Sequence, residues 1–306
     1  MRALASFIMR GRGQAILAAV GSAALMWILP PLNILLGGIV ALVTLRHGPI
    51  EGLLLIAGTF LISAALATLG AADSTVVTAF MTMLGVATWP VWLLAVVLRR
   101  TISLSITVTV AAVLGALVVA GFHLVLDEPV AWWKQVFSAA AEQTVASTGA
   151  PVDMESLASL VDIAARWMTG TLAAALAVGS LVALFLGRWW QAMLYNPGGF
   201  RQEFQGLRLG NALAIAVGAV MLAAWWLGGT GGQVASDLLW VAGAIYMLPG
   251  LSVIHMLLAG TSHPVGGLVV LYILLAIVPH VAVLVALVGW ADTWLDMRSR
   301  IGARKA

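Results

Sequence analysis

The stretch RWWQAMLYNPGGFRQEFQGLR, residues Arg188–Arg208, separates two long apolar runs at 167–187 and 209–228. It combines arginines, aromatic side chains and a Pro-Gly-Gly turn. The rest of the chain is dominated by hydrocarbon: 62% of its residues are hydrophobic, 9% are charged and the mean hydropathy is +1.06. Soluble domains carry roughly 25% charged residues. The stretch is therefore where a membrane-embedded chain meets water between two membrane segments.

Apolar runs long enough to cross a bilayer, about 20 residues each, recur along the whole chain. They cover residues 13–29, 32–45, 50–69, 76–98, 102–126, 167–187, 209–228, 236–259 and 265–290. These runs predict an all-α fold, a polytopic transmembrane helical bundle of about eight to nine membrane segments. We expect residues 1–306 to form a single integral membrane domain, whose first helix is retained rather than cleaved as a signal peptide.

Two of the runs are unusual. Residues 32–45 would span only about 21 Å as a helix, against a hydrocarbon core of about 30 Å, so this run is expected to be tilted, broken or re-entrant after Pro30-Pro31. Residues 102–110, ISLSITVTV, alternate as a β-strand does. An isolated strand would leave its backbone unpaired in lipid, so we predict a helix whose hydroxyls bond one turn back or to a neighbouring helix.

The distribution of arginines predicts the orientation. Arginines at 2, 10, 12, 46, 99 and 100 precede the first run or follow alternate hairpins, as cytoplasmic loops do. We therefore expect a multi-pass protein of the bacterial inner membrane with a cytoplasmic N-terminus, and with 188–208 as a cytoplasmic elbow. Nine crossings would leave the basic C-terminal tail outside. A cytoplasmic tail is favoured instead, with one late segment not crossing; Pro249-Gly250 and Pro279-His280 are the candidate break points.

The one long polar insertion covers residues 127–166. From Asp127 through Asp162 it holds six acidic residues and one lysine, a net charge of −5. Trp133, Val136, Phe137 and Ala140 have helical spacing, which predicts an amphipathic helix over 129–146. A turn is expected at 147–151, and a second helix from about Asp153 that continues into the next span. This extramembrane hairpin is interpreted either as a surface cap or as a periplasmic lid or docking face.

The elbow is the first candidate binding or interaction site. Its aromatics are typical of a membrane interface, its turn suits proline and glycine, and a short amphipathic helix follows. Glu203 is expected to pair with an arginine there. Anchoring alone is the alternative. The candidate residues are Arg188, Trp189, Trp190, Asn196, Pro197, Gly198, Gly199, Phe200, Arg201 and Glu203.

Other candidates lie near the C-terminus. Tyr246, His255 and His280 are polar groups in apolar runs, and we expect them to converge on a ligand cavity of several hundred Å³. His123, near a run's end, needs a hydrogen-bond partner within the bundle. In the segment WADTWLDMR, Asp292 and Asp296 lie one turn apart, where they either bind a cation or act as acid and base, or form ion pairs with arginines such as Arg298.

Several classes of function are disfavoured. The chain has no cysteine, and its five histidines lack the spacing of a zinc site. It carries no phosphate-binding loop, dinucleotide-binding glycine motif or nucleophile elbow. Basic residues flank membrane segments rather than forming a nucleic-acid patch. We therefore expect no metal, no cofactor, no nucleic-acid partner and no enzymatic activity.

Two segments resemble a known family. RWWQAMLYNPGGFRQEFQGLRLG and the C-terminal GLSVIHMLLAG, YILLAIVP and VGWADTWLDMRSR resemble the YybS-like family of bacterial membrane proteins, a group of unknown function. The resemblance implies a multi-spanning inner-membrane protein and no particular reaction. The stripe Ala15, Ala19 and Ala23 is also similar to the small-residue motif by which substrate-binding subunits of energy-coupling-factor transporters dock onto their coupling protein.

Two functions are consistent with these patterns. The first is a small-molecule or lipid-binding, transport-related membrane subunit without its own ATPase. The second is a non-catalytic scaffold that recruits partners through the elbow or the hairpin. Besides the lipid bilayer, the expected partners are accordingly a small hydrophobic ligand or another protein.

Overall fold

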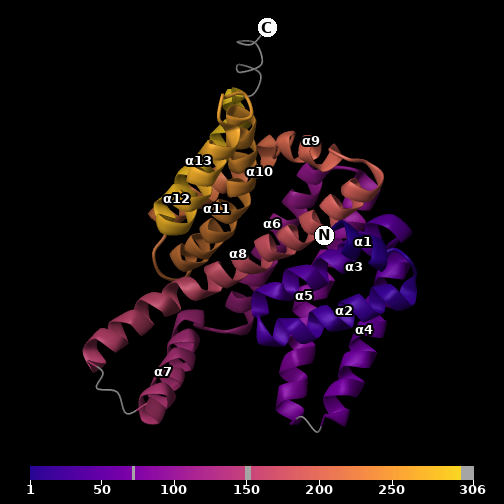
Figure 1. Ribbon diagram of the computed structural model, residues 1–306. Coiled ribbons are helices and arrows are strands. Elements are labelled where there is room, and N and C mark those ends of the chain that lie inside the picture. Colours follow the sequence, from indigo (N-terminus) through magenta and orange to yellow (C-terminus); the bar gives the residue numbers. More distant parts are fainter. Residues whose placement is uncertain (71–72, 149–152, 298–306) are drawn as a thin grey trace. The chain divides into compact units, whose positions relative to one another are not determined.

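The computed structural model describes residues 1–70, 73–148 and 153–297 (Figure 1). These residues form α-helices joined by short connections, and none of them is in a β-strand. The helices are α1 (Arg2–Ile8), α2 (Arg12–Ile28), α3 (Asn33–His47), α4 (Pro49–Leu69), α5 (Ser74–Thr101), α6 (Leu104–Val125), α7 (Pro129–Thr148), α8 (Met154–Tyr195), α9 (Gly199–Gln205), α10 (Asn211–Trp226), α11 (Gly229–Leu258), α12 (Pro264–Ile277) and α13 (Pro279–Leu295), with a 3-10 turn at Pro30–Leu32.

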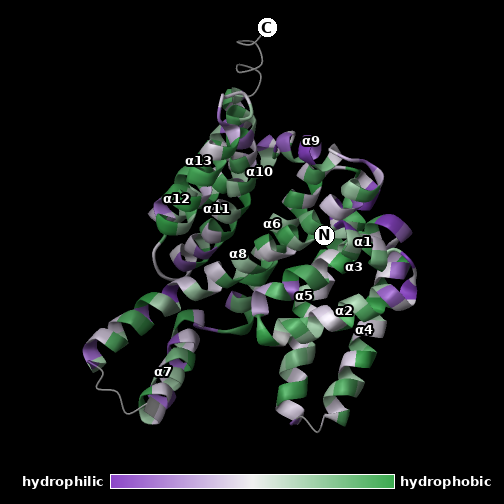
Figure 2. Cartoon of the chain, in the orientation of Figure 1, coloured by the Kyte–Doolittle hydropathy of each residue, from purple (hydrophilic) through white to green (hydrophobic). Residues whose placement is uncertain are grey.

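Each of the nine apolar runs is helical, which confirms the polytopic helical fold. Among the residues that the structure describes, six helices are long and apolar enough to cross a membrane, and the bent pair α12–α13 makes up to seven. The remaining runs are α2 and α10, whose 17 and 16 residues fall just below a spanning length. Hydrophilic residues gather on α9 and at helix ends, whereas α10–α13 are largely hydrophobic (Figure 2).

The chain divides into two compact units. Unit 1 comprises Met1–Ala111, Val178–Leu209 and Ser252–Ser262, and unit 2 comprises Ala112–Ala177, Gly210–Leu251 and His263–Ala306. The boundaries fall within α6, α8 and α11, so these three helices contribute to both units. The expectation of one integral membrane domain stays a prediction.

Helix α3 forms the centre of unit 1. Every residue from Leu36 to Leu45 is buried, which explains how so short an apolar run is accommodated. Glycines allow α8 to approach α3 closely: a Cβ added to Gly187 would lie 2.5 Å from the Cβ of Ala41 and 2.7 Å from the carbonyl oxygen of Gly38. None of the three residues of the preceding 3-10 turn, Pro30–Leu32, is buried.

The alanine stripe of α2 is also part of this core. Ala15, Ala19 and Ala23 are all buried in the hydrophobic cluster of unit 1. The stripe therefore serves close packing inside this chain. It is not exposed for docking onto a coupling protein, so that implication of the transporter resemblance is wrong for these three residues.

The strand-like segment at the start of α6 is helical, as lipid requires. The hydroxyls of Thr107 and Thr109 donate to the carbonyls of Ser103 and Ser105, at 2.8 and 2.9 Å. Such bonds to the preceding turn satisfy the hydroxyl without a partner helix. Both the helix and its internal hydroxyl bonds were expected from the sequence.

The insertion is built from α7 and the first part of α8. As predicted, the second helix begins after Asp153, whose carboxylate accepts from the N–H of Glu155 and the hydroxyl of Ser156, and it continues without a break. Its 42 residues correspond to about 63 Å, twice the thickness of a bilayer core. Part of α8 must therefore extend beyond the membrane. Helix α7 reaches Thr148; the rest of the expected turn lies outside the described residues.

The chain reverses between α12 and α13. The two helices meet at 119° across Val278-Pro279, so Pro279 is a break point, whereas Pro249 lies inside the continuous α11. The indole Nε1 of Trp290 in α13 donates to the carbonyl oxygen of Ala214 at 3.0 Å, in the first turn of α10. The C-terminal end of α13 is thus fixed beside the start of α10.

Candidate functional site

The elbow is held by an ion pair. The Nε of Arg188 donates to Oε2 of Glu203 at 2.9 Å, a second guanidinium nitrogen contacts the other carboxylate oxygen, and Nη1 donates to Gln191 at 2.6 Å. This two-pronged geometry is the strongest form of arginine–carboxylate contact. It joins the end of α8 to α9 and confirms the expected pairing of Glu203.

Aromatic rings fill the inside of the elbow. Gly198 has a φ of +89°, the left-handed conformation that glycine adopts without strain, and it starts α9. Phe200 packs on Phe185 at 5.7 Å, and Phe204 meets the imidazole of His255 edge-on at 5.8 Å. The hydroxyl of Ser252 donates to the carbonyl of Phe204 at 2.6 Å. The elbow therefore lies against the end of α11.

One elbow residue is placed differently from the expectation. Trp190 was expected at the membrane interface, but its side chain is 0% exposed and belongs to the core of unit 1. Gly38 leaves room for its ring, because a Cβ there would lie 3.4 Å from Trp190. Trp189 is exposed instead, and Asn196, Pro197 and Arg201 are exposed around the turn.

The C-terminal candidates have different surroundings. Tyr246 is buried against α13, His280 is exposed at the start of that helix, and His255 belongs to unit 1. The expected convergence of these three residues stays a prediction. A described cavity of about 40 Å³, room for a few waters, is lined by Arg12, His47 and Glu51 instead.

The aspartates of α13 have separate positions. Asp292 is buried, and its carboxylate accepts from the N–H of Met297 at 3.0 Å. Asp296 has a φ of +40° and ends the helix. The Asp292 carboxylate thus holds the backbone of Met297, just beyond the end of its own helix. Arg298 lies outside the described residues.

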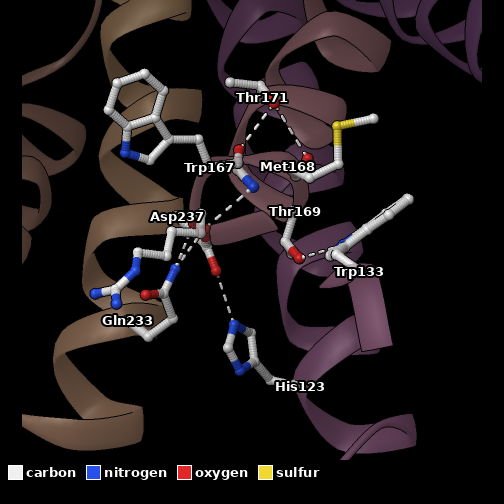
Figure 3. A network of polar contacts seen from close by, with 10 residues as sticks. His123, Trp133, Trp167, Met168, Thr169, Thr171, Gln233 and Asp237 are labelled. Atoms are coloured by element: carbon white, nitrogen blue, oxygen red, sulfur yellow. Dashed lines mark hydrogen bonds and ion pairs between the residues drawn. The ribbon is translucent and has the colours of Figure 1, made fainter. Parts of the chain in front are cut away.

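A buried polar network in unit 2 centres on Asp237 of α11 (Figure 3). Only 1% of the Asp237 side chain is exposed, and 8% of that of His123 in α6. The imidazole Nε2 of His123 lies 2.8 Å from Oδ2 of Asp237. The other carboxylate oxygen accepts from the backbone N–H of Gly170 at 3.1 Å and from Nε2 of Gln233 at 3.3 Å.

The network extends to the base of the hairpin. Gln233, one turn before Asp237, also donates to the carbonyl of Arg166 at 2.8 Å, and Trp133 of α7 donates to the hydroxyl of Thr169 at 3.0 Å. Phe122, next to His123, stacks on Trp133 at 5.8 Å. Figure 3 shows these side chains converging from α6, α7, α8 and α11. Four helices are therefore tied together at one point.

Glycine at position 170 makes this approach possible. A Cβ there would lie 2.8 Å from the Cα of Asp237 and 2.7 Å from Cδ1 of Trp240. Both are closer than side chains tolerate, and the first is backbone, which cannot rotate away. Only a residue without a side chain brings the backbone N–H of α8 within bonding distance of the Asp237 carboxylate.

The chemistry of the network suits a proton more than a metal. Gly170 and Gln233 are N–H donors, so two of the three partners of Asp237 favour an ionised carboxylate and offer a cation no ligand. In the described part of the chain, no group of three His, Cys, Asp or Glu side chains is arranged to hold a metal ion. What the network offers is an imidazole–carboxylate pair in an apolar bundle.

The sequence indicated half of this site. His123 was expected to need a partner, and it has one. Asp237 was missed, because the spans were interpreted as nearly free of acidic residues. It lies at the start of an apolar run, 114 positions after His123. The available signal was that an ionisable residue within a membrane helix is by default a functional candidate.

Residues 15–293 match the family described as "Predicted membrane protein (DUF2232)". The match covers nearly the whole chain, so the protein belongs to this family of membrane proteins, and the expectation of a multi-spanning family of unknown function is confirmed. No curated protein and no solved structure matches the chain significantly.

Proposed function

Because the chain belongs to a family of membrane proteins, we propose that it is a binding, transport-related membrane subunit without an ATPase or enzymatic activity of its own. One observation carries the proposal: the buried pair His123–Asp237 joins two apolar, span-length helices. Ionisable side chains are costly within a bilayer and mark ion or substrate pathways. A purely structural contact would be served as well by apolar residues of similar volume.

The kind of ligand follows from the contacts of the network. Its polar groups bond to one another in this conformation, and the cavity of about 40 Å³ that Arg12, His47 and Glu51 line lies in unit 1. A drug-sized molecule needs at least about 300 Å³. The proposal therefore covers an ion bound in this conformation, or a small hydrophobic molecule or lipid admitted when α8 and α11 separate.

The test compares two buried aspartates. Wild type, Asp237→Asn and Asp292→Asn would be released from native membranes and weighed intact by mass spectrometry, to detect co-purified lipid or metabolite. We expect a bound molecule whose occupancy falls about tenfold in Asp237→Asn, since a charged hydrogen bond contributes about 1.5–3 kcal/mol, and stays unchanged in Asp292→Asn. Equal occupancy in all three proteins would count against the proposal.

The proposed orientation places the N-terminus and the elbow in the cytoplasm of a bacterial inner membrane. Arginine distribution supports it, and so does the reversal at Pro279. Five residues separate the end of α11 from the start of α12, and Trp290 fixes α13 beside the start of α10. We therefore interpret α12 and α13 as a re-entrant hairpin that leaves the basic tail on the cytoplasmic side.

The cysteine-free chain makes this orientation simple to test. Single cysteines would replace Gln202 in α9, Thr230 at the start of α11 and Ser299 in the tail, and intact cells would be treated with a membrane-impermeant maleimide. We expect labelling of Thr230→Cys from outside, and labelling of the other two only after permeabilisation. Labelling of Ser299→Cys in intact cells would make α12–α13 a crossing.

A scaffold is the second candidate, favoured by the hairpin surface. Trp132, Val136, Leu160 and Ile163 are exposed there, on a part of the chain that must extend beyond the bilayer. A photo-crosslinking residue at Val136 would be compared with one at Val182, a valine of α8 with the same exposure. A discrete protein adduct at position 136 alone, with ligand occupancy independent of Asp237, would favour the scaffold.

A further inference from the structure

We propose that Nδ1 of His123 is the binding site for a proton, held ready by the carboxylate of Asp237. This deepens the proposed function and rests on it, because it assigns the bound species at the same pair. Nothing in the described part of the chain bonds to Nδ1, although this nitrogen is buried. A buried polar nitrogen without a partner is rare and calls for a physical reason.

The hydrogen bonds determine which ring nitrogen is free. Gly170 and Gln233 both donate to Oδ1 of Asp237, and Gln233 must present its NH₂ there because the same nitrogen also donates to the carbonyl of Arg166. Both N–H donors favour an ionised Asp237 carboxylate, and Nε2 of His123 then donates to its Oδ2. In a neutral imidazole with hydrogen on Nε2, Nδ1 carries a lone pair.

Proton uptake at this atom balances without another reactant. A hydronium ion gives up one O–H bond and leaves as water, one N–H bond forms at Nδ1, and no bond in the protein breaks. The neutral imidazole beside a carboxylate thereby becomes an imidazolium–carboxylate ion pair. The negative charge of Asp237 at 2.8 Å favours that charged form. Once protonated, the pair carries no net charge, which is the arrangement an apolar bundle tolerates best.

The neighbouring charged groups do not compete for this role. On α7 and α8, Lys134 and Arg166 both bond to Asp162, which is half-exposed to solvent, and Glu128 precedes α7. On α11 the ionisable group that faces His123 is Asp237 itself. A proton can arrive by a short path, because His123 lies two residues before the end of α6 at Val125, where Leu124 and Val125 are exposed.

The test is nitrogen NMR of histidine-labelled, full-length protein in lipid nanodiscs, titrated over about pH 5 to 8. The His123 signals would be assigned by their loss in His123→Gln. We expect a bare Nδ1 at the upper end that gains a proton as the pH falls, with Nε2–H present throughout. In Asp237→Asn the midpoint should fall by about one to three pH units, as removal of a nearby opposite charge predicts. Asp237→Glu should restore it in part.

Two results would overturn the proton site. One is a hydrogen on Nδ1 at every pH, which would mean that Nε2 accepts from a protonated Asp237. The other is a His123 midpoint that Asp237→Asn leaves unmoved. If Asp237→Asn does not fold, the wild-type titration alone still decides. If the titration fails but ligand occupancy still depends on Asp237, the proton site is ruled out and the proposed function remains. If the titration succeeds but ligand occupancy does not depend on Asp237, only a lipid or metabolite ligand is ruled out.

Discussion

The buried threonines of unit 1 and the polar network of unit 2 differ in where they form hydrogen bonds. In unit 1, Thr44, Thr59 and Thr88 donate to carbonyls four residues earlier in their own helices, at 2.7–2.8 Å. In unit 2, His123, Asp237 and Trp133 bond to other helices. A hydroxyl that bonds within its helix is compatible with any packing partner, whereas an interhelical network requires a particular one. Under the proposed function, we attribute packing to the buried threonines of unit 1 and binding to the His123–Asp237 pair of unit 2.

The largest expected effect follows from breaking the central pair. Asp237→Asn leaves His123 without its counter-charge. It also places a second side-chain amide beside that of Gln233, so that two NH₂ groups compete for one position. Removal of one member of a buried pair typically costs about 3 kcal/mol. The matched change in unit 1 is Thr88→Val, for which about 0.6 kcal/mol is expected. Reversible unfolding in lipid would measure both free energies; equal costs would erase the distinction between the units.

A somewhat smaller effect is expected at the close contact of α8 and α11. Gly170→Ala places a methyl group against the backbone of Asp237 and should cost about 2 kcal/mol by overpacking. Gly179→Ala, in the same helix, meets no atom within 4 Å, so it should be neutral or slightly stabilising. Unfolding free energies of the two variants provide the comparison, and a tolerated Gly170→Ala would show that the helices are farther apart than described.

Trp133→Phe tests the outer bond of the network. It keeps the ring that stacks on Phe122 but removes the indole N–H that bonds to Thr169. Interhelical hydrogen bonds in membranes average about 0.6 kcal/mol, so a loss of that order is expected. Hydrogen exchange at the base of α7 should rise with it. An unchanged exchange rate would mean that stacking, rather than the hydrogen bond, fixes the hairpin.

The smallest effect concerns an exposed aspartate of unit 1. The backbone N–H of Thr75, 2.7 Å from Asp73, holds the pKa of this carboxyl below its usual value and caps α5. Since the folded pKa is lowered, the contribution is present above the unfolded pKa of about 3.9 and is lost as the pH falls through the folded value. Asp73→Asn keeps the cap and should remove this shallow acid dependence of the melting temperature. Unlike Asp237→Asn, it should not cause a large loss of stability.

Hydropathy was sufficient to predict the helices, but side-chain partners were not predictable in the same way. All nine apolar runs are helical, because a chain in lipid must pair its backbone locally. Pairing of Glu203 with an arginine of the elbow was also predictable, but the sequence did not identify Arg188 as that arginine. Trp190 and Asp237 were not predictable from local pattern. The burial of Trp190 depends on Gly38, and the role of Asp237 on His123, and both partners are distant in the sequence.

A double-mutant cycle between His123 and Asp237 tests the central claim most directly. Unfolding free energies in lipid would be measured for His123→Gln, Asp237→Asn and the double variant, with His123→Gln and Asp292→Asn as the control cycle. The account predicts a coupling of about 1–3 kcal/mol between His123 and Asp237 and additivity within about 0.5 kcal/mol in the control. Additive effects of His123 and Asp237 would contradict it.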